Sequence, residues 1–289
     1  MNKLIKNIRE YVGLSQQELA DNLKTSFATI NRWENSKAFP NKTAQVILYD
    51  FCKENNVPVC EMTLQRIQDE VDQINISNDR IILYHGSKYG IDGPIAPISR
   101  PKCDFGKGFY MGSDPMQALT LIFDYEKSKF YIVSLSLEEL EYLDIPANLK
   151  WAMIVAYNRG KMDEIKETKL YDKYQQICTN KDLMIGSIAN DRMFYVLESF
   201  FQGNITDLAL VKSLSALNLG KQYVALTQKA CDKVKIEKEI SISFLERLFL
   251  EDKNEENRIN GISLANKICR DYRREGKFFD EILEETKGE

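Results

Sequence analysis

Three segments that lie far apart in the chain contain residue types suited to a ligand site. Tyr-His-Gly-Ser occupies positions 84–87 and includes the single histidine of the sequence. Asp-Phe-Gly-Lys-Gly-Phe-Tyr follows at 104–110, and Gln-Tyr-Val-Ala-Leu follows at 222–226. One histidine by itself is usually an ordinary core or surface residue. The three segments therefore support a functional hypothesis only in combination.

Each residue type in these segments favours a particular contact with a ligand. His85 can hydrogen-bond a hydroxyl group, and Tyr110 can stack its ring on a flat cationic ring. Gly86 has no side chain, so its backbone N–H and C=O can come close to an amide. Gln222 can hydrogen-bond a hydroxyl but cannot take a proton, so it cannot be a general base.

The residues around these segments indicate the elements that must position them. The apolar run 81–84 is typical of a buried strand, and a loop rich in Pro and Gly follows it over 86–108. Further strands are expected over 109–111, 130–137, 223–226 and 234–236. Helices are expected from Pro115 through Leu121, over 149–159 and 191–202, and from Phe244 to the end.

The three segments together resemble the His-Tyr-Glu branch of the ADP-ribosyltransferases, which includes diphtheria toxin and the poly(ADP-ribose) polymerases. They match its His-Gly-Ser, its Gly-Lys-Gly-x-Tyr and the strand that begins with its acidic residue. The string 83–110, with Asn-Asp-Arg at 190–192 and the segment at Gln222, is more similar still to an uncharacterised bacterial group of that clan. The resemblance covers residues 80–236.

The resemblance implies a substrate and a set of site residues. NAD+ would be the substrate, and its nicotinamide would leave an oxocarbenium-like ribose centre. It implies that His85, Gly86, Ser87 and Tyr110 bind NAD+, and that His85, Tyr110 and Gln222 act in catalysis. We expect His85, Gly86, Tyr110 and Gln222 to line one cleft beside a split antiparallel sheet.

Two positions depart from the pattern of that branch. Its second stacking tyrosine corresponds to Leu121, so stacking is one-sided unless Phe109 or another aromatic residue substitutes. Its catalytic glutamate corresponds to Gln222, which favours transfer of a single ADP-ribose to a good nucleophile over chain elongation. Asp191 and Asp104 are candidates for an auxiliary role, although an aspartate at such a position is more often a helix cap or a loop residue.

The first 55 residues have the spacing of short helices. Ser15 with Glu18 forms a capping box, Ser26 can cap the next helix, and Pro40 blocks its continuation. The stretch 14–35 resembles the helix-turn-helix of phage repressors, with Lys24 where those proteins usually have a glycine.

The second helix of this motif leaves a face free for the major groove of DNA. Asn and Arg can read base edges, and an apolar side chain can contact a thymine methyl group. The expected base-reading residues are Phe27, Ala28, Asn31 and Arg32, and the resemblance adds Gln16 and Lys37 as phosphate contacts. The alternative is a helical bundle used for dimerisation or docking of a partner.

The sequence therefore predicts an α+β protein with two domains. An all-α helix-turn-helix domain is expected over 1–58, a linker over 59–78, a mixed α/β domain like an ADP-ribosyltransferase over 79–240, and a helical tail over 241–289. The formal charge is −4 overall, but the first 60 residues carry +2. This asymmetry favours the N-terminal part for a contact with nucleic acid.

The composition indicates which compartment, partners and metals are expected for the protein. The sequence contains no apolar window long enough for a membrane span and no apolar leader at its start, so we expect no membrane partner. Six scattered cysteines without a C-x-x-C pair suit a reducing cytoplasm and argue against zinc or another metal.

Three functions remain open at this point. The first is a mono-ADP-ribosyltransferase that modifies a macromolecular acceptor and carries a DNA-binding module, as a toxin of a toxin–antitoxin pair or a phage-defence transferase would. Its partners would be NAD+, DNA, the acceptor, and an antitoxin or a second copy. The alternative is a transcription regulator whose inactive C-terminal domain senses NAD+ or a related nucleotide. In a third interpretation both parts bind proteins. Release of nicotinamide distinguishes the first from the others.

Overall fold

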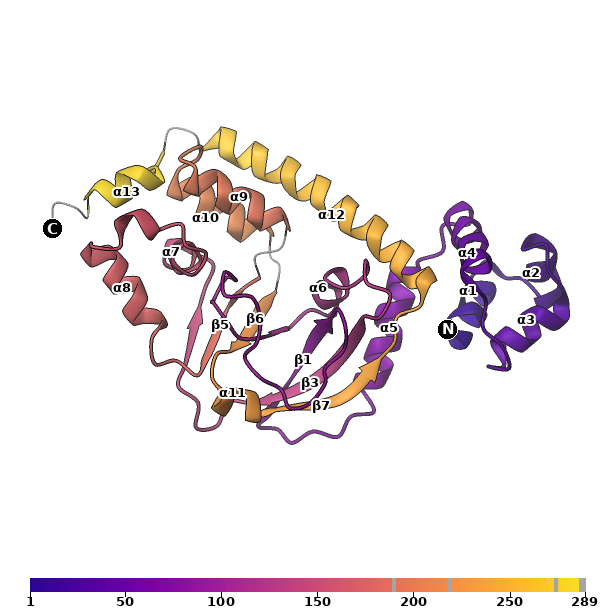
Figure 1. The fold of residues 1–289 in the computed structure, drawn as a ribbon. Coiled ribbons are helices and arrows are strands. Elements are labelled where there is room, and N and C mark those ends of the chain that lie inside the picture. Colours follow the sequence, from indigo (N-terminus) through magenta and orange to yellow (C-terminus); the bar gives the residue numbers. More distant parts are fainter. Residues whose placement is uncertain (189–190, 218–219, 273–274, 286–289) are drawn as a thin grey trace.

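The computed structural model describes residues 1–188, 191–217, 220–272 and 275–285, with only the backbone for 191–194 and 214–217. The N-terminal helices lie beside a mixed α/β part, and the long helix α12 (Phe244–Asp271) begins next to α4 and α5 and extends over the mixed part (Figure 1). None of the helices in these ranges is both long enough and apolar enough to cross a membrane.

Five helices form the N-terminal part, and local signals explain their ends. They are α1 (Asn2–Val12), α2 (Gln16–Asn22), α3 (Phe27–Glu34), α4 (Lys42–Glu54) and α5 (Val59–Val71). Ser15 and Glu18 form the expected capping box of α2, and the Ser26 hydroxyl accepts the Thr29 N–H at the start of α3. Lys24, between these helices, has a φ of 52°, the left-handed conformation that glycine adopts most easily.

A sheet of seven strands forms the centre of the second part. The strands are β1 (Arg80–Ser87), β2 (Phe109–Gly112), β3 (Lys129–Ser136), β4 (Tyr142–Ile145), β5 (Leu183–Ser187), β6 (Lys221–Ala225) and β7 (Val234–Ile240). Their order is β4-β5-β6-β2-β1-β3-β7, with β4 and β5 parallel and the other pairs antiparallel. β1 and β2 pair at one position, Tyr84 with Gly112, and this narrow junction joins the two halves of the sheet.

Helices cover the sheet and the ends of its strands. They are α6 (Pro115–Thr120), α7 (Leu149–Asn158), the 3-10 turn η1 (Asp163–Ile165), α8 (Lys169–Cys178), α9 (Asp191–Phe201), α10 (Asp207–Leu217), α11 (Gln228–Asp232), α12 and α13 (Phe279–Glu285). Figure 1 shows α9 and α10 beneath the far half of α12. The apolar core around Trp151 packs α7, α9 and α10 against one face of β5 and β6.

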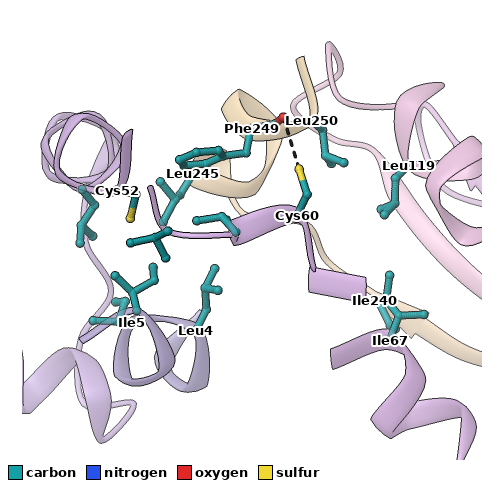
Figure 2. Packing of buried hydrophobic residues seen from close by; sticks show 14 of the residues in the cluster. Leu4, Ile5, Cys52, Cys60, Ile67, Leu119, Ile240, Leu245, Phe249 and Leu250 are labelled. Atoms are coloured by element: carbon teal, nitrogen blue, oxygen red, sulfur yellow. Dashed lines mark hydrogen bonds between the residues drawn. The ribbon is translucent and has the colours of Figure 1, made fainter. Parts of the chain in front are cut away.

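One apolar cluster continues from the N-terminal helices into the second part. It joins Leu4, Ile5 and Cys52 to Leu245, Phe249 and Leu250 of α12, and then to Leu119 and Ile240 (Figure 2). The segment expected as a linker contains α5, whose residues Cys60 and Ile67 are buried in this cluster. The helix-turn-helix is thus held against the C-terminal region by a shared core.

Candidate functional site

The outer face of α3 carries the residues expected to read DNA. Phe27, Ala28 and Arg32 are exposed, and Asn31 is partly buried. Ile30 and Trp33 on the opposite face are buried in the N-terminal core. This division orients α3, because the buried residues fix which side chains are left for a partner.

A hydrogen-bonded network fixes the junction between α1, α2 and α3. Arg9 donates from Nε and Nη2 to the two carboxylate oxygens of Glu34, at 2.7 and 3.1 Å. Gln16 Nε2 donates to Glu34 Oε2 at 2.7 Å, and Gln16 Oε1 accepts Asn31 Nδ2 at 3.2 Å. Burial would raise the pKa of Glu34, but the bonds from Arg9 and Gln16 hold it below its ordinary value.

This network affects two of the expected DNA contacts. Gln16 and Asn31 bind each other, so their amide groups are held in place beside the exposed face of α3. Lys37 follows the end of α3 and is exposed, so a phosphate can reach it.

The single histidine lies at the junction between β1 and β2. His85 Nδ1 is 2.7 Å from the carbonyl oxygen of Tyr110, and its ring stacks on Phe109 with centroids 4.3 Å apart. A carbonyl only accepts, so Nδ1 carries the proton and Nε2 is an acceptor. Burial lowers the pKa of His85, which favours this neutral form.

The side chains of His85, Tyr110 and Gln222 do not share one face of the sheet, so the expectation of a single cleft lined by all three is wrong. In the strand register Gly112 opposes both Tyr84 and Gln222, and Tyr110 opposes Val224. Alternation along the strands therefore directs Tyr110 and Gln222 to one face and His85 to the other, with Phe109. His85 contacts the backbone carbonyl oxygen of Tyr110, whose side chain lies on the other face.

Tyr110 is held by the loop that precedes it. Its hydroxyl donates to the carbonyl oxygen of Gly106 at 2.7 Å and accepts the N–H of Phe105 at 3.1 Å. Burial raises the pKa of this hydroxyl, so it stays protonated. The ring is consequently fixed in orientation, as a stacking platform must be.

Gln222 is buried, with 6% of its surface exposed, and both protons of its amide are used. Nε2 donates to Asp104 Oδ2 at 3.0 Å and to the carbonyl oxygen of Ser187 at 2.9 Å. Asp104 Oδ1 in turn accepts Arg159 Nε at 3.0 Å and Nη2 at 2.5 Å. Within the described ranges, no hydrogen bond reaches the carbonyl oxygen Oε1 of Gln222.

Packing explains the small residues at the end of β1. A Cβ at Gly86 would lie 2.4 Å from the carbonyl oxygen of Ala118 and 2.8 Å from Ile122, so the approach of α6 itself requires glycine there. The Ser87 hydroxyl donates to the carbonyl oxygen of Gly90 at 2.6 Å. Leu121, at the end of α6, is 68% exposed.

The structure shows where Phe109, the expected second stacking ring, and Asp104, an expected auxiliary residue, lie. Phe109 is buried against His85, on the face opposite Tyr110, so it does not supply a second stacking ring. Asp104 meets Gln222, as an auxiliary residue would, whereas the side chain of Asp191 and all of Asn190 lie outside the described residues. Sequence reasoning missed Arg159 and Ser187, since neither belongs to a motif.

These observations define a helix-turn-helix module, the kind that binds DNA, fused to a mixed α/β domain. A helix-turn-helix family model matches residues 5–47, which confirms the expected motif. A second model, described as protein of unknown function (DUF3990), matches residues 81–236, more than half of the chain. The chain belongs to this family. No curated protein and no solved structure matches it.

Proposed function

We propose that this protein is a DNA-binding regulator that recognises a specific sequence through α3. This proposal rests on the exposed face of α3. That face presents Phe27, Ala28 and Arg32 beside the Gln16–Asn31 pair. An arginine can bond a guanine edge through two donors, and an apolar side chain can contact a thymine methyl group. Both chemistries are present on one turn of one helix.

Replacement of Arg32 with Ala tests the proposed face. If Arg32 contacts a base, the change should cost about 1–3 kcal/mol of specific binding. The measurement is a gel-shift titration on the native upstream region. Lys166→Ala, which removes one exposed positive charge from the second part, is the control and should bind as the wild type does. Equal affinity of Arg32→Ala and wild type would contradict the assignment.

We further propose that the second part binds NAD+ or a related nucleotide, and that this binding regulates the DNA-binding part. One acceptor on the face where Tyr110 lies supports the proposal: Oε1 of Gln222 has no hydrogen-bond partner among the described residues. An acceptor of this kind suits a ribose hydroxyl, and NAD+ carries two ribose rings. Tyr110 would stack on the nicotinamide, and Gly86 would offer backbone groups to its carboxamide.

Mono-ADP-ribosyl transfer to a macromolecular acceptor is the second candidate function. The buried carboxylate of Asp104, beside Gln222 and on the side of the sheet where Tyr110 lies, favours it. A negative charge there would stabilise the positive ribose that forms when nicotinamide leaves. A toxin or phage-defence role would follow from such transfer.

One experiment separates sensing from transfer. Purified protein is incubated with labelled NAD+, alone and with cell lysate, and both NAD+ affinity and nicotinamide release are measured. Binding without release supports the regulator, and release with label on lysate material supports the transferase. Separate digestion with protease and nuclease then identifies the acceptor class. Absence of binding would contradict both NAD+ proposals.

A further inference from the structure

The amide of Gln222 has one orientation that satisfies its neighbours. The Asp104 carboxylate and the Ser187 carbonyl oxygen are both acceptors, so the amide nitrogen must face them. Asp104 is itself fixed, because Arg159 donates twice to its other oxygen. The carbonyl oxygen of Gln222 is left as the group that a ligand meets.

We propose that Asp104 is a positioning residue that turns the carbonyl oxygen of Gln222 toward a ligand hydroxyl, and that a carboxylate at position 222 is excluded while Asp104 is present. The proposal rests on the NAD+ site proposed above and names the contact that this site offers: an acceptor for a hydroxyl donor. Gln222 and Asp104 thus form a matched pair of one amide and one carboxylate.

This pair explains why position 222 is a glutamine, whereas the ADP-ribosyltransferases that the sequence resembles have a glutamate at the corresponding position. A glutamate at 222 would bring two buried carboxylates into contact, and like charges at this distance raise the pKa of one of them. It would also direct a carboxylate oxygen at the Ser187 carbonyl oxygen, where a donor is needed. The negative charge of the site therefore lies on the loop before β2 and not on β6.

Exchange of the two side chains tests the proposal. The variants are Asp104→Asn, Gln222→Glu and the double variant with both changes, which keeps one amide and one carboxylate. Gln68→Glu is the matched control, because Gln68 also donates to an aspartate, Asp72, at an exposed site. For each protein we would measure the unfolding temperature from pH 4.5 to 8 and the affinity for NAD+.

Gln222→Glu should lower the unfolding temperature by roughly 5–10 °C at pH 7.5, as expected when an uncompensated charge is buried. The folded-state pKa of the new carboxyl pair is raised, so the loss should shrink as the pH falls toward the unfolded value of about 4.3. The double variant should recover the part of the loss that comes from the two facing carboxylates, while the contact with the Ser187 carbonyl oxygen stays unfavourable. Gln68→Glu should unfold within about 1 °C of the wild type.

Asp104→Asn should weaken NAD+ binding by about tenfold, the effect of one lost hydrogen bond. In Asp104→Asn, Arg159 would still donate to the side-chain oxygen of residue 104. The new amide nitrogen would then donate to Oε1 of Gln222 and draw that oxygen away from the ligand. The double variant should regain NAD+ affinity, since a carboxylate at 222 then presents an acceptor to the ligand. A purely structural role for Asp104 would not give this recovery.

The possible outcomes distinguish failure of the positioning role of Asp104 from failure of the NAD+ site. Wild-type NAD+ affinity in Asp104→Asn, or a double variant no better than Gln222→Glu, would overturn the positioning role and leave the NAD+ site standing. If the wild type fails to bind NAD+, the NAD+ site and the ligand contact of Gln222 are both overturned. The exclusion of a carboxylate at 222 is then decided by the unfolding temperatures, which need no ligand.

Discussion

At the scale of single residues, His85 has a defined protonation state imposed by its surroundings. Its Nδ1 proton points at the carbonyl oxygen of Tyr110, and its ring is stacked on Phe109. Because burial lowers its pKa, the neutral ring is the form that the folded protein contains near pH 7. Protonation would place a charge between two strands that meet at one position of the sheet.

This state predicts a stability change on acidification. In the unfolded chain His85 takes a proton near pH 6.5, and in the folded chain only at lower pH. The folded state should therefore lose stability as the pH falls below about 6.5, by up to about 1.4 kcal/mol per pH unit. Urea unfolding from pH 8 to 5 measures this loss.

His85→Gln is the comparison for this measurement, because an amide can still donate to the Tyr110 carbonyl but does not titrate. The sequence has no second histidine, so the difference between the two proteins isolates one group. Parallel curves for the two proteins over the whole range would show that His85 titrates normally in the folded state.

At the scale of elements, the sequence predicted those features that depend on neighbours along the chain. Ser15 and Ser26 cap α2 and α3 as expected, and the apolar runs at 81–84 and 109–111 lie within β1 and β2. Such signals lie within a few residues of the element that they define.

Other elements depend on distant partners and were not predicted. β5 is five residues long, and its apolar run is too short to separate a strand from a buried helix turn. Its place in the sheet follows from pairing with β6, where Gly186 opposes Gln222. The contact of Gln222 with Asp104 joins residues 118 positions apart, which no local pattern could indicate. The sequence could therefore name the motif residues of the candidate site but could not predict how they lie relative to one another.

At the scale of the whole molecule, α12 connects the two functional parts. Its first turns pack against α4 and α5, where Phe249 contacts Tyr49 with ring centroids 4.9 Å apart. Buried Glu246 accepts Arg66 at 2.6 Å and Thr63 at 3.1 Å, and Asp252 accepts Tyr49 at 2.7 Å. Its later turns pack against α9 and α10. One continuous helix therefore contacts both parts of the molecule.

Phe249→Ala should weaken this connection. Removal of a buried phenylalanine costs about 3–5 kcal/mol, and here the loss falls on the contact between the two parts. We expect lower stability in denaturant and faster proteolysis in the segment 72–79 between α5 and β1. Leu264→Ala, at an exposed position of the same helix, is the control and should change stability by less than about 0.5 kcal/mol. Unchanged proteolysis of Phe249→Ala would mean that the two parts are held together elsewhere.

The apolar cluster shared by the N-terminal helices and α12 also limits how such a protein can evolve. A helix-turn-helix with a complete core of its own can be exchanged between genes as a cassette. Here Leu4, Ile5 and Cys52 are covered partly by residues encoded some 200 positions later (Figure 2). A recombination event that moved only the first segment would expose apolar surface in both products. The segments that encode the N-terminal helices and α12 are therefore expected to be inherited together.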